Sequence, residues 1–184
     1  MNHRDAETLV DDMAAAWNVR DLERYLSYLT EDVVWADPAM PVPAVGREAV
    51  RAFSESVLRA FPDFCYEIRH PVCVAADGSR CAVAWTIRAT SLGSLDPPGF
   101  GPSGRAVEFQ GVDLLEFRAG EVSRIDTYFD VREPTAQLLS VELRPAPGSP
   151  MERIFVWAQR ARAAWLRRFR KVPRESAGLD DNVD

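Results

Sequence analysis

Apolar residues recur at helical spacing in the first part of the chain. From residue 5 to residue 29 they fall three or four positions apart, as at Leu9 and Met13, and a polar "NVRD" break divides the run. This spacing predicts two helices, with Asp21 as the N-cap of the second. A third helix is predicted over "REAVRAFSESVLRAF", and Pro62 is expected to end it.

Elsewhere the apolar positions alternate or run together, as in strands. A strand is predicted over Val33 to Ala36, and the proline-rich "PAMPVPAVGREAV" after it is expected to be a loop. Four more segments follow: "FCYEIRHPVCVAA", "RCAVAWTIRAT", "RAVEFQGVDLLEF" and "EVSRIDTYFD". The tight turns "DGS" and "RAGE" between neighbours predict an antiparallel meander. The order α-α-β-α-β-β-β-β predicts an α+β fold: a cone-shaped barrel in which a curved antiparallel sheet wraps around the N-terminal helices and closes a pocket.

The C-terminal part has a different composition. We expect residues 1–140 to form the α+β domain, 141–150 a Pro-rich linker, 151–172 a basic amphipathic helix and 173–184 a disordered tail. The helix has three interpretations: a packing or dimer helix, a membrane-surface helix, or a nucleic-acid contact. The first is favoured, because the two tryptophans and the phenylalanine in its apolar stripe suit docking onto protein. We therefore expect a homodimer.

Composition and charge exclude several classes of function. The net charge of −6 over 184 residues argues against nucleic-acid binding by the whole chain. The sequence has no apolar run that would span a membrane and no secretory signal pattern, so a cytoplasmic location is expected. Its three cysteines are expected to be buried, reduced thiols. With only His3 and His70 available, a histidine-rich metal site or a Ser-His-Asp triad is not expected, so no metal or cofactor is predicted.

A glycine pattern, "GFGPSG", formally matches a dinucleotide-binding motif. It leads into a strand instead of a helix, so it is interpreted as part of a long hairpin loop from Ser91 to Arg105. A loop of this length at the mouth of a pocket is able to act as a lid.

Asp113 lies on the apolar face of its strand. In "VEFQGVDLLEF" the alternation places it on the same side as Val107 and Phe109. A carboxylate there must find a partner, line a wet cavity or take up a proton. The alternative is a structural carboxylate paired with an arginine or a backbone amide.

Asp37 shares the face of Val33 and Trp35 at the end of its strand. Because Pro38 follows, it is also a candidate turn residue. Two carboxylates on apolar faces that the same helices cover nevertheless predict a functional pair.

The last strand carries further acids. Its alternation places Thr127 and Phe129 on one face, and Asp126 and Asp130 on the other face or at the rim. Asp130 alternatively caps a short helix over "VREPTAQLL".

Large side chains on the inward faces are expected to line the pocket, although the aromatic ones are also ordinary core residues. These are Met13, Trp17, Tyr25, Trp35, Phe53, Trp85, Phe109, Thr127 and Phe129.

The collected segments resemble the nuclear-transport-factor-2-like superfamily, in particular the SnoaL-like polyketide cyclases and, more distantly, ketosteroid isomerase. The matching segments are "AAAWNVRDLERYLSYLTEDVVWADP", "GREAVRAF", "FPDF", "GRAVEFQGVDLLEFRAGEVSRIDTYFD" and "QLL", over roughly residues 6 to 139. The resemblance implies the fold predicted above. It leaves the activity open among isomerases, cyclases, epoxide hydrolases, dehydratases and noncatalytic binders.

The resemblance also implies roles for two residues. Asp37 corresponds to the general base of the isomerase, and Asp113 to its protonated oxyanion-hole aspartate. The first-helix tyrosine of the isomerase aligns with Met13, so its phenol is missing unless Tyr25 or Tyr28 substitutes for it.

Two further positions depart from the cyclases. Their strand-end histidine corresponds to Ser91 here. Their acid-base aspartate corresponds to Thr127, which Asp126 and Asp130 flank.

The sequence therefore predicts a cofactor-independent enzyme for a small apolar carbonyl compound, most like a polyketide cyclase. Asp37 would remove a proton next to the carbonyl, and Asp113 would donate a hydrogen bond to the enolate oxygen. One alternative is an epoxide hydrolase or dehydratase, with Asp126 or Asp130 as the acid and Arg88 or Arg124 orienting it. Another is a noncatalytic protein that binds an apolar ligand or forms a dimeric scaffold.

Overall fold

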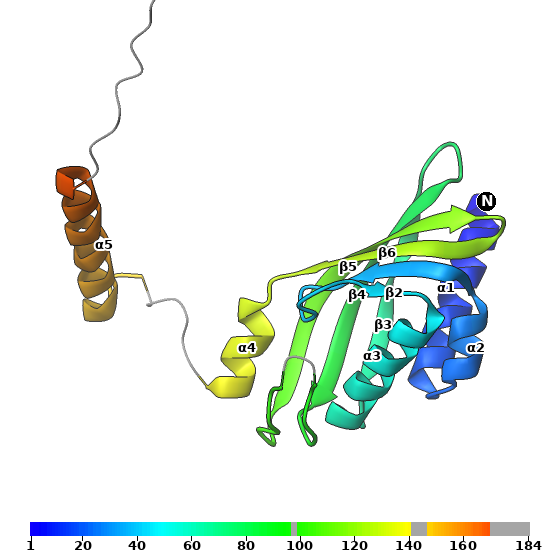
Figure 1. The fold of residues 1–184 in the computed structure, drawn as a ribbon, viewed down its shortest axis with the longest axis horizontal. Helices are drawn as coiled ribbons and strands as arrows, with labels where there is room; N and C mark the ends of the chain where they lie inside the picture. Colours follow the sequence, from blue (N-terminus) through cyan, green and yellow to red (C-terminus); the bar gives the residue numbers. More distant parts are fainter. Residues whose placement is uncertain (97–98, 141–146, 170–184) are drawn as a thin grey trace, which may run out of the picture. The chain divides into compact units, whose positions relative to one another are not determined.

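The computed structural model describes residues 1–96, 99–140 and 147–169, which fall into two compact units divided after residue 141 (Figure 1). Most of the expected linker, residues 170–172 of the expected last helix and the expected tail lie outside the described residues. The helices are α1 His3–Asn18, α2 Leu22–Ser27, α3 Arg47–Ala60, α4 Arg132–Leu139 and α5 Pro150–Phe169. The strands are β1 Leu29–Ala36, β2 Ala44–Val45, β3 Cys65–Val74, β4 Arg80–Thr90, β5 Ala106–Arg118 and β6 Glu121–Phe129.

Side chains cap the first two helices. The side chain of Asn2 accepts a hydrogen bond from the Asp5 backbone N–H at 2.9 Å and opens α1. Asp21 accepts one from the Arg24 N–H at 3.0 Å, which confirms the predicted cap of α2. Each cap satisfies a backbone donor that has no partner within the helix.

The six strands of the described residues form one curved sheet in the order β2-β1-β6-β5-β4-β3. Strands β3 to β6 are the predicted antiparallel meander, whereas β1 joins β6 in parallel, so the α+β sheet is mixed. β1 begins at Leu29, earlier than predicted, because Leu29 already pairs with Val122 of β6. The loop expectation after β1 was partly wrong: Ala44, which follows the last proline of that segment, pairs with Trp35 as part of β2.

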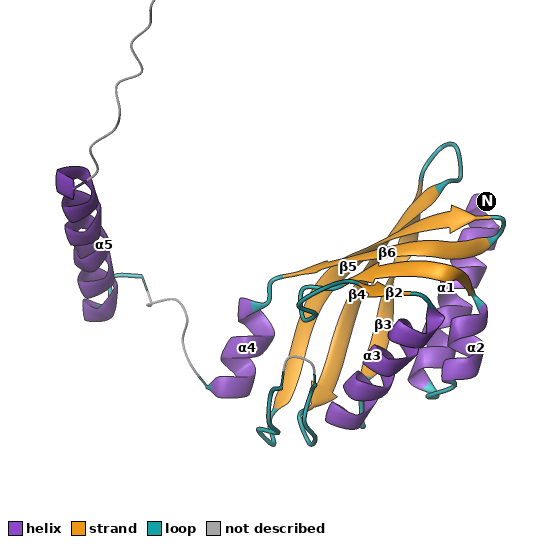
Figure 2. Ribbon diagram, in the orientation of Figure 1, coloured by secondary structure: helices purple, strands orange, loops and turns teal. Residues whose placement is uncertain are grey.

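Helices α1, α2 and α3 gather on one side of the sheet, and α4 lies apart from them (Figure 2). α1 packs mainly on β3, α3 packs on β1 and β2, and α4 packs on β5. The buried side chains between them include Leu29, Val50, Val83 and Val122. This arrangement confirms that the helices cover the inner face of the sheet.

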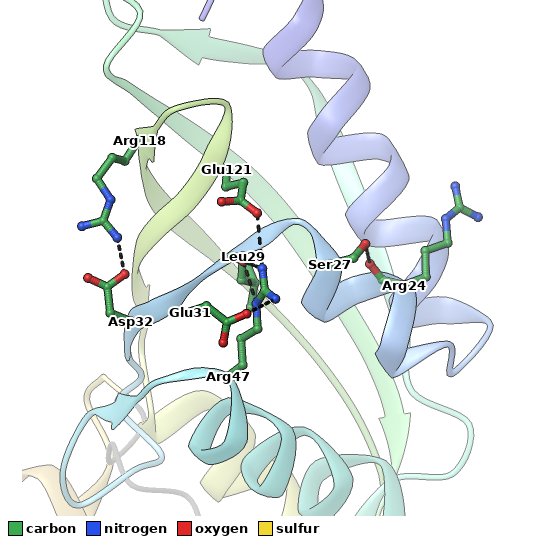
Figure 3. A network of polar contacts seen from close by, with 8 residues as sticks. All are labelled: Arg24, Ser27, Leu29, Glu31, Asp32, Arg47, Arg118 and Glu121. Carbon is green, nitrogen blue, oxygen red and sulfur yellow. Dashed lines mark hydrogen bonds and ion pairs between the residues drawn. The ribbon is translucent and has the colours of Figure 1, made fainter.

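A polar network fixes β1 beside β6 and α3 (Figure 3). The guanidinium of Arg47, in the first turn of α3, donates to the Leu29 carbonyl at 2.8 Å and pairs with Glu31 and Glu121. Arg118 of β5 pairs with Asp32 of β1. These contacts hold the strand whose far end carries Asp37.

The expectation that all three cysteines are buried was wrong. The three thiols are free, but Cys65 and Cys73 are exposed and Cys81 is buried. Cys65 and Cys73 occupy outward positions of β3, which is the edge strand of the sheet.

Helix α5 belongs to the second unit and spans Pro150–Phe169, within the region where the last helix is expected. Within the described ranges, no helix has the length and apolar character needed to cross a membrane.

Candidate functional site

A cavity of about 400 Å³ lies within the first unit, lined by side chains of α1 to α4 and of the sheet. This volume is typical of pockets that hold a small organic molecule. Every residue predicted to line the pocket does so: Met13, Trp17, Tyr25, Trp35, Phe53, Trp85, Phe109, Thr127 and Phe129. Most of the remaining lining is aliphatic, so the cavity suits a largely apolar ligand.

Two groups of aromatic rings in edge or tilted contact form much of the wall. In the first group, Trp17 contacts Tyr25 at 5.1 Å and Trp35 at 6.0 Å between ring centroids. In the second, Trp85 contacts Phe109 at 5.8 Å and Phe129 at 6.2 Å. Such contacts stabilise the rings beyond their burial alone, so the same side chains are both core and pocket wall.

Asp113 projects from β5 into this apolar cavity, as its place on the apolar face of the strand predicts. The Tyr66 hydroxyl donates to Oδ2 of Asp113 at 2.8 Å, and the Thr127 hydroxyl donates to Oδ1 at 2.8 Å. Thr127 itself accepts a hydrogen bond from the indole N–H of Trp35 at 3.0 Å. The carboxyl therefore has a hydroxyl partner at each oxygen, and neither the arginine nor the backbone amide of the structural alternative is among them.

Burial raises the pKa of Asp113, because a charged carboxylate loses its solvation inside the protein. The hydrogen bonds from Thr127 and Tyr66 oppose this rise. The nearby Trp85 side chain also lowers the pKa, although its Nε1 lacks the geometry of a hydrogen bond. The net direction is upward, so desolvation outweighs the donors.

Asp37 follows the last residue of β1 and lines the same cavity. Its Oδ1 accepts a hydrogen bond from the Ala39 N–H at 2.7 Å, which is the turn role expected of an aspartate before proline. Burial raises the pKa of Asp37 to about 6, the Ala39 hydrogen bond opposes the rise, and the charge of Asp113 adds to it. The turn role and the pocket role therefore coexist in one residue.

The other two predicted acids do not line the described pocket. Asp126 forms a two-point ion pair with Arg124 of the same strand, with both contacts at 2.7 Å. Asp130 is paired with Arg132 and also accepts the Arg132 backbone N–H at 3.1 Å in the turn before α4. The N-cap position of α4 is Val131, which makes no side-chain capping hydrogen bond. Arg88 pairs with two glutamates at the surface.

Tyr66 is the pocket residue that sequence reasoning missed. Tyr25 lines the cavity near Asp113, whereas Tyr28 contacts Arg24 and is not among the described lining residues. The phenol on Asp113 comes instead from β3, far along the chain from Met13. The alternation in "FCYEIRH" carries the signal, because it places Tyr66 and Ile68 on the inward face of β3.

Helix α4 and the loop between β4 and β5 complete the lining. Leu95 and Phe100 of the loop and Leu138 of α4 line the cavity. The side-chain amide of Gln137 accepts from the Glu108 N–H at 2.8 Å and donates to the Glu108 carbonyl at 2.7 Å. These two hydrogen bonds hold α4 against β5, in the part of β5 that extends past its pairing with β6.

Comparisons with known proteins agree with this architecture. The SnoaL-like domain model matches residues 10–125. A structure from Pseudomonas putida, provisionally assigned as a polyketide cyclase, is 24% identical with a TM-score of 0.63 over 72% of this chain and 96% of its own. AclR from Streptomyces galilaeus, provisionally assigned as a hydroxylase, is 24% identical with a TM-score of 0.64 over 92% and 99%. TerC, co-crystallised with polyporic acid, is 20% identical with a TM-score of 0.59 over 72% and 96%. No curated protein matches significantly.

Proposed function

The chain belongs to the SnoaL-like domain family, and we propose that it uses its pocket for cofactor-independent acid-base chemistry on a small apolar carbonyl compound. Cyclisation or isomerisation through an enolate is the reaction class, as in a lyase or isomerase. The observation that carries the proposal is an apolar cavity holding two carboxyls, both with raised pKa values.

Asp37 acts as the general base. A pKa of about 6 leaves its carboxylate mostly ionised at neutral pH while making it a stronger base than an ordinary aspartate. It removes a proton from the carbon next to the carbonyl, and the electron pair moves into the enolate. The Ala39 N–H holds Oδ1, which leaves Oδ2 to receive the proton.

Asp113 acts as the acid partner. Burial favours its neutral form, which stabilises an enolate oxygen by donating a hydrogen bond. Asp37 and Asp113 thus act as base and acid in the same cavity.

Water addition to an epoxide, or dehydration, ranks below this reaction. That chemistry would use Asp126 or Asp130, which are paired with arginines and do not line the described pocket. Noncatalytic binding of an apolar ligand uses the same cavity, and the experiment below separates it from catalysis.

Deuterium exchange of 2-tetralone tests the proposal. This bicyclic ketone is small, apolar and enolisable, and proton NMR in D2O follows the loss of its acidic C–H signal. We expect the full-length protein to accelerate exchange, and Asp37→Asn to lower the acceleration by at least about 10²-fold, the low end of what a positioned base contributes.

Asp32→Asn is the matched control. Asp32 lies on the same strand, is paired with Arg118 at the surface and does not line the cavity, so its replacement should leave the exchange rate unchanged. Saturable binding of 2-tetralone without any acceleration would support a binding protein and contradict the enzyme proposal.

Location and assembly are further proposals. We propose that the protein acts in the cytoplasm as a homodimer, supported by the apolar stripe of α5 with Trp157 and Trp165. Sedimentation of the full chain and of a chain ending at residue 150 tests the assembly: loss of the dimer on truncation supports it, and an unchanged oligomeric state removes α5 from the interface.

A further inference from the structure

We propose that Tyr66 is a catalytic residue of this pocket, and that the proton of Asp113 reaches the substrate oxygen through the Tyr66 phenol. This inference rests on the proposed function and defines the route by which the proton of Asp113 reaches the substrate.

The hydrogen bond between Tyr66 and Asp113 is short and lies at the cavity wall. The hydroxyl oxygen of Tyr66 is 2.8 Å from Oδ2 of Asp113, and both residues line the cavity. The Tyr66 ring also lies against Trp85, with 5.8 Å between centroids. The phenol thus contacts the carboxyl at the wall of the space that a ligand would fill.

The backbone of Tyr66 is clamped from α1. The Asn18 side chain accepts the Tyr66 N–H at 2.8 Å and donates to the Tyr66 carbonyl at 2.8 Å. β3 is an edge strand, so these two backbone groups face away from β4 and Asn18 takes the place of a neighbouring strand. A clamp at this residue fixes the position from which the phenol reaches Asp113.

The second oxygen of Asp113 explains why the proton must pass toward Tyr66. The Thr127 hydroxyl has one proton, which it donates to Oδ1, while it accepts the indole N–H of Trp35. A proton on Oδ1 would compete with this donor. The acidic proton of neutral Asp113 therefore sits on Oδ2. In this neutral form the hydrogen bond with Tyr66 reverses: Oδ2 donates to the phenol oxygen, and the phenol proton is free to point into the cavity.

The resulting step balances. Asp37 takes the C–H proton, and the electron pair of the broken C–H bond forms the carbon–carbon double bond. The carbonyl oxygen accepts the electron pair of the C=O π bond. The phenol proton of Tyr66 moves to that oxygen, and the Oδ2 proton of Asp113 moves to Tyr66. The products are an enol, a protonated Asp37 and an Asp113 carboxylate that Thr127 and Tyr66 stabilise.

The electrostatics agree with this direction of transfer. Burial and the neighbouring Asp113 raise the pKa of Tyr66 well above its ordinary value, so a lasting phenolate is disfavoured. A phenol in this position must be reprotonated as it donates, and Asp113 is the group in hydrogen-bond contact that can do so.

Tyr66→Phe tests the inference in the 2-tetralone exchange assay. We expect the rate to fall about 10²-fold, as when one donor to a developing oxyanion is removed. Tyr28→Phe is the control, because its hydroxyl contacts Arg24 and Tyr28 does not line the described pocket. Near-ultraviolet circular dichroism checks that both variants keep the fold.

Binding of 4-nitrophenol tests the role of Tyr66 without any turnover. The phenolate of 4-nitrophenol mimics an enolate oxygen, and its absorbance reports binding. We expect Tyr66→Phe to bind it about 10-fold more weakly than the wild-type protein, the loss of one hydrogen bond to a charged oxygen. Tyr28→Phe should bind it like the wild type.

The two assays separate the possible failures. If Asp37→Asn slows exchange and Tyr66→Phe does not, the role of Tyr66 is overturned and the proposed function stands. If the wild type does not accelerate exchange, the proposed function fails, and the 4-nitrophenol comparison alone decides whether Tyr66 is the oxyanion donor. Equal binding by wild type and Tyr66→Phe overturns the inference.

Discussion

Replacing Asp37 with asparagine measures how much the charged Asp37 carboxylate in the pocket destabilises the folded protein. Asparagine keeps the shape and the oxygen that accepts the Ala39 N–H, but it cannot ionise. The folded-state pKa of Asp37 is raised above the value in the unfolded chain, so the folded protein binds a proton more tightly. Ionisation therefore destabilises the fold as pH rises, and the variant escapes that loss.

The magnitude follows from the pKa values. The rise from the ordinary pKa of 3.8 to about 6 corresponds to about 3 kcal/mol, since each pKa unit is worth about 1.4 kcal/mol. Asp37→Asn should be as stable as the wild type below about pH 4, and should gain stability between about pH 4 and pH 6. Above that window the gain should stay constant at up to about 3 kcal/mol.

Urea unfolding followed by tryptophan fluorescence measures this difference over the pH range. Subtracting the two curves at each pH removes the contribution of all other titrating groups. Asp32→Asn, which removes a surface carboxylate on the same strand, should show no such gain. A difference between Asp37→Asn and wild type that does not change with pH, or a variant less stable than wild type at about pH 8, would refute the reasoning.

Three further substitutions test the architecture around the pocket. Gly111→Ala should destabilise the protein by about 1–3 kcal/mol in urea, because a Cβ there would lie 2.3 Å from Cζ2 of Trp85; unchanged stability would show that the ring moves freely. Thr127→Val should cost about 1–3 kcal/mol by leaving the Trp35 indole and Oδ1 of Asp113 without their partner, and a neutral effect would argue against the bridge. Gln137→Ala should speed hydrogen exchange at the Glu108 amide by about 10-fold, with the amides of central β4 as the internal reference; equal protection would mean that α4 does not depend on this contact.

The fold was largely predictable because most elements are set by local periodicity. Period-two alternation identified the meander, and helical spacing with Asp21 as a cap identified the first helices. β2 was missed because two residues give no periodic pattern, and their pairing depends on the return of the chain to Trp35. The parallel pairing of β1 with β6 is likewise a long-range choice that no local pattern encodes.

The site was predictable where one residue conflicts with its surroundings. Asp113 on an apolar face is such a conflict, and the structure places it in the cavity with Asp37. Tyr66 shows no such conflict, because an aromatic residue on a strand is ordinary. Its role in the site depends on a hydrogen bond to Asp113, which is 47 positions away in the sequence. Asp126 and Asp130 were further candidate acids, expected on the other face or at the rim of their strand. Each is paired with a neighbouring arginine and does not line the described pocket.

The central claim, that the pocket keeps Asp37 poised as a base, is tested most directly by a site-resolved titration. Carbon-13 NMR of aspartate carboxyl groups in the full-length protein follows each midpoint, and the signal absent from Asp37→Asn assigns Asp37. We predict a pKa of about 6 for Asp37, raised mainly by burial, and an Asp113 carboxyl that stays protonated at the pH where Asp37 ionises. A midpoint for Asp37 near the ordinary value of 3.8 would contradict its role as a poised base.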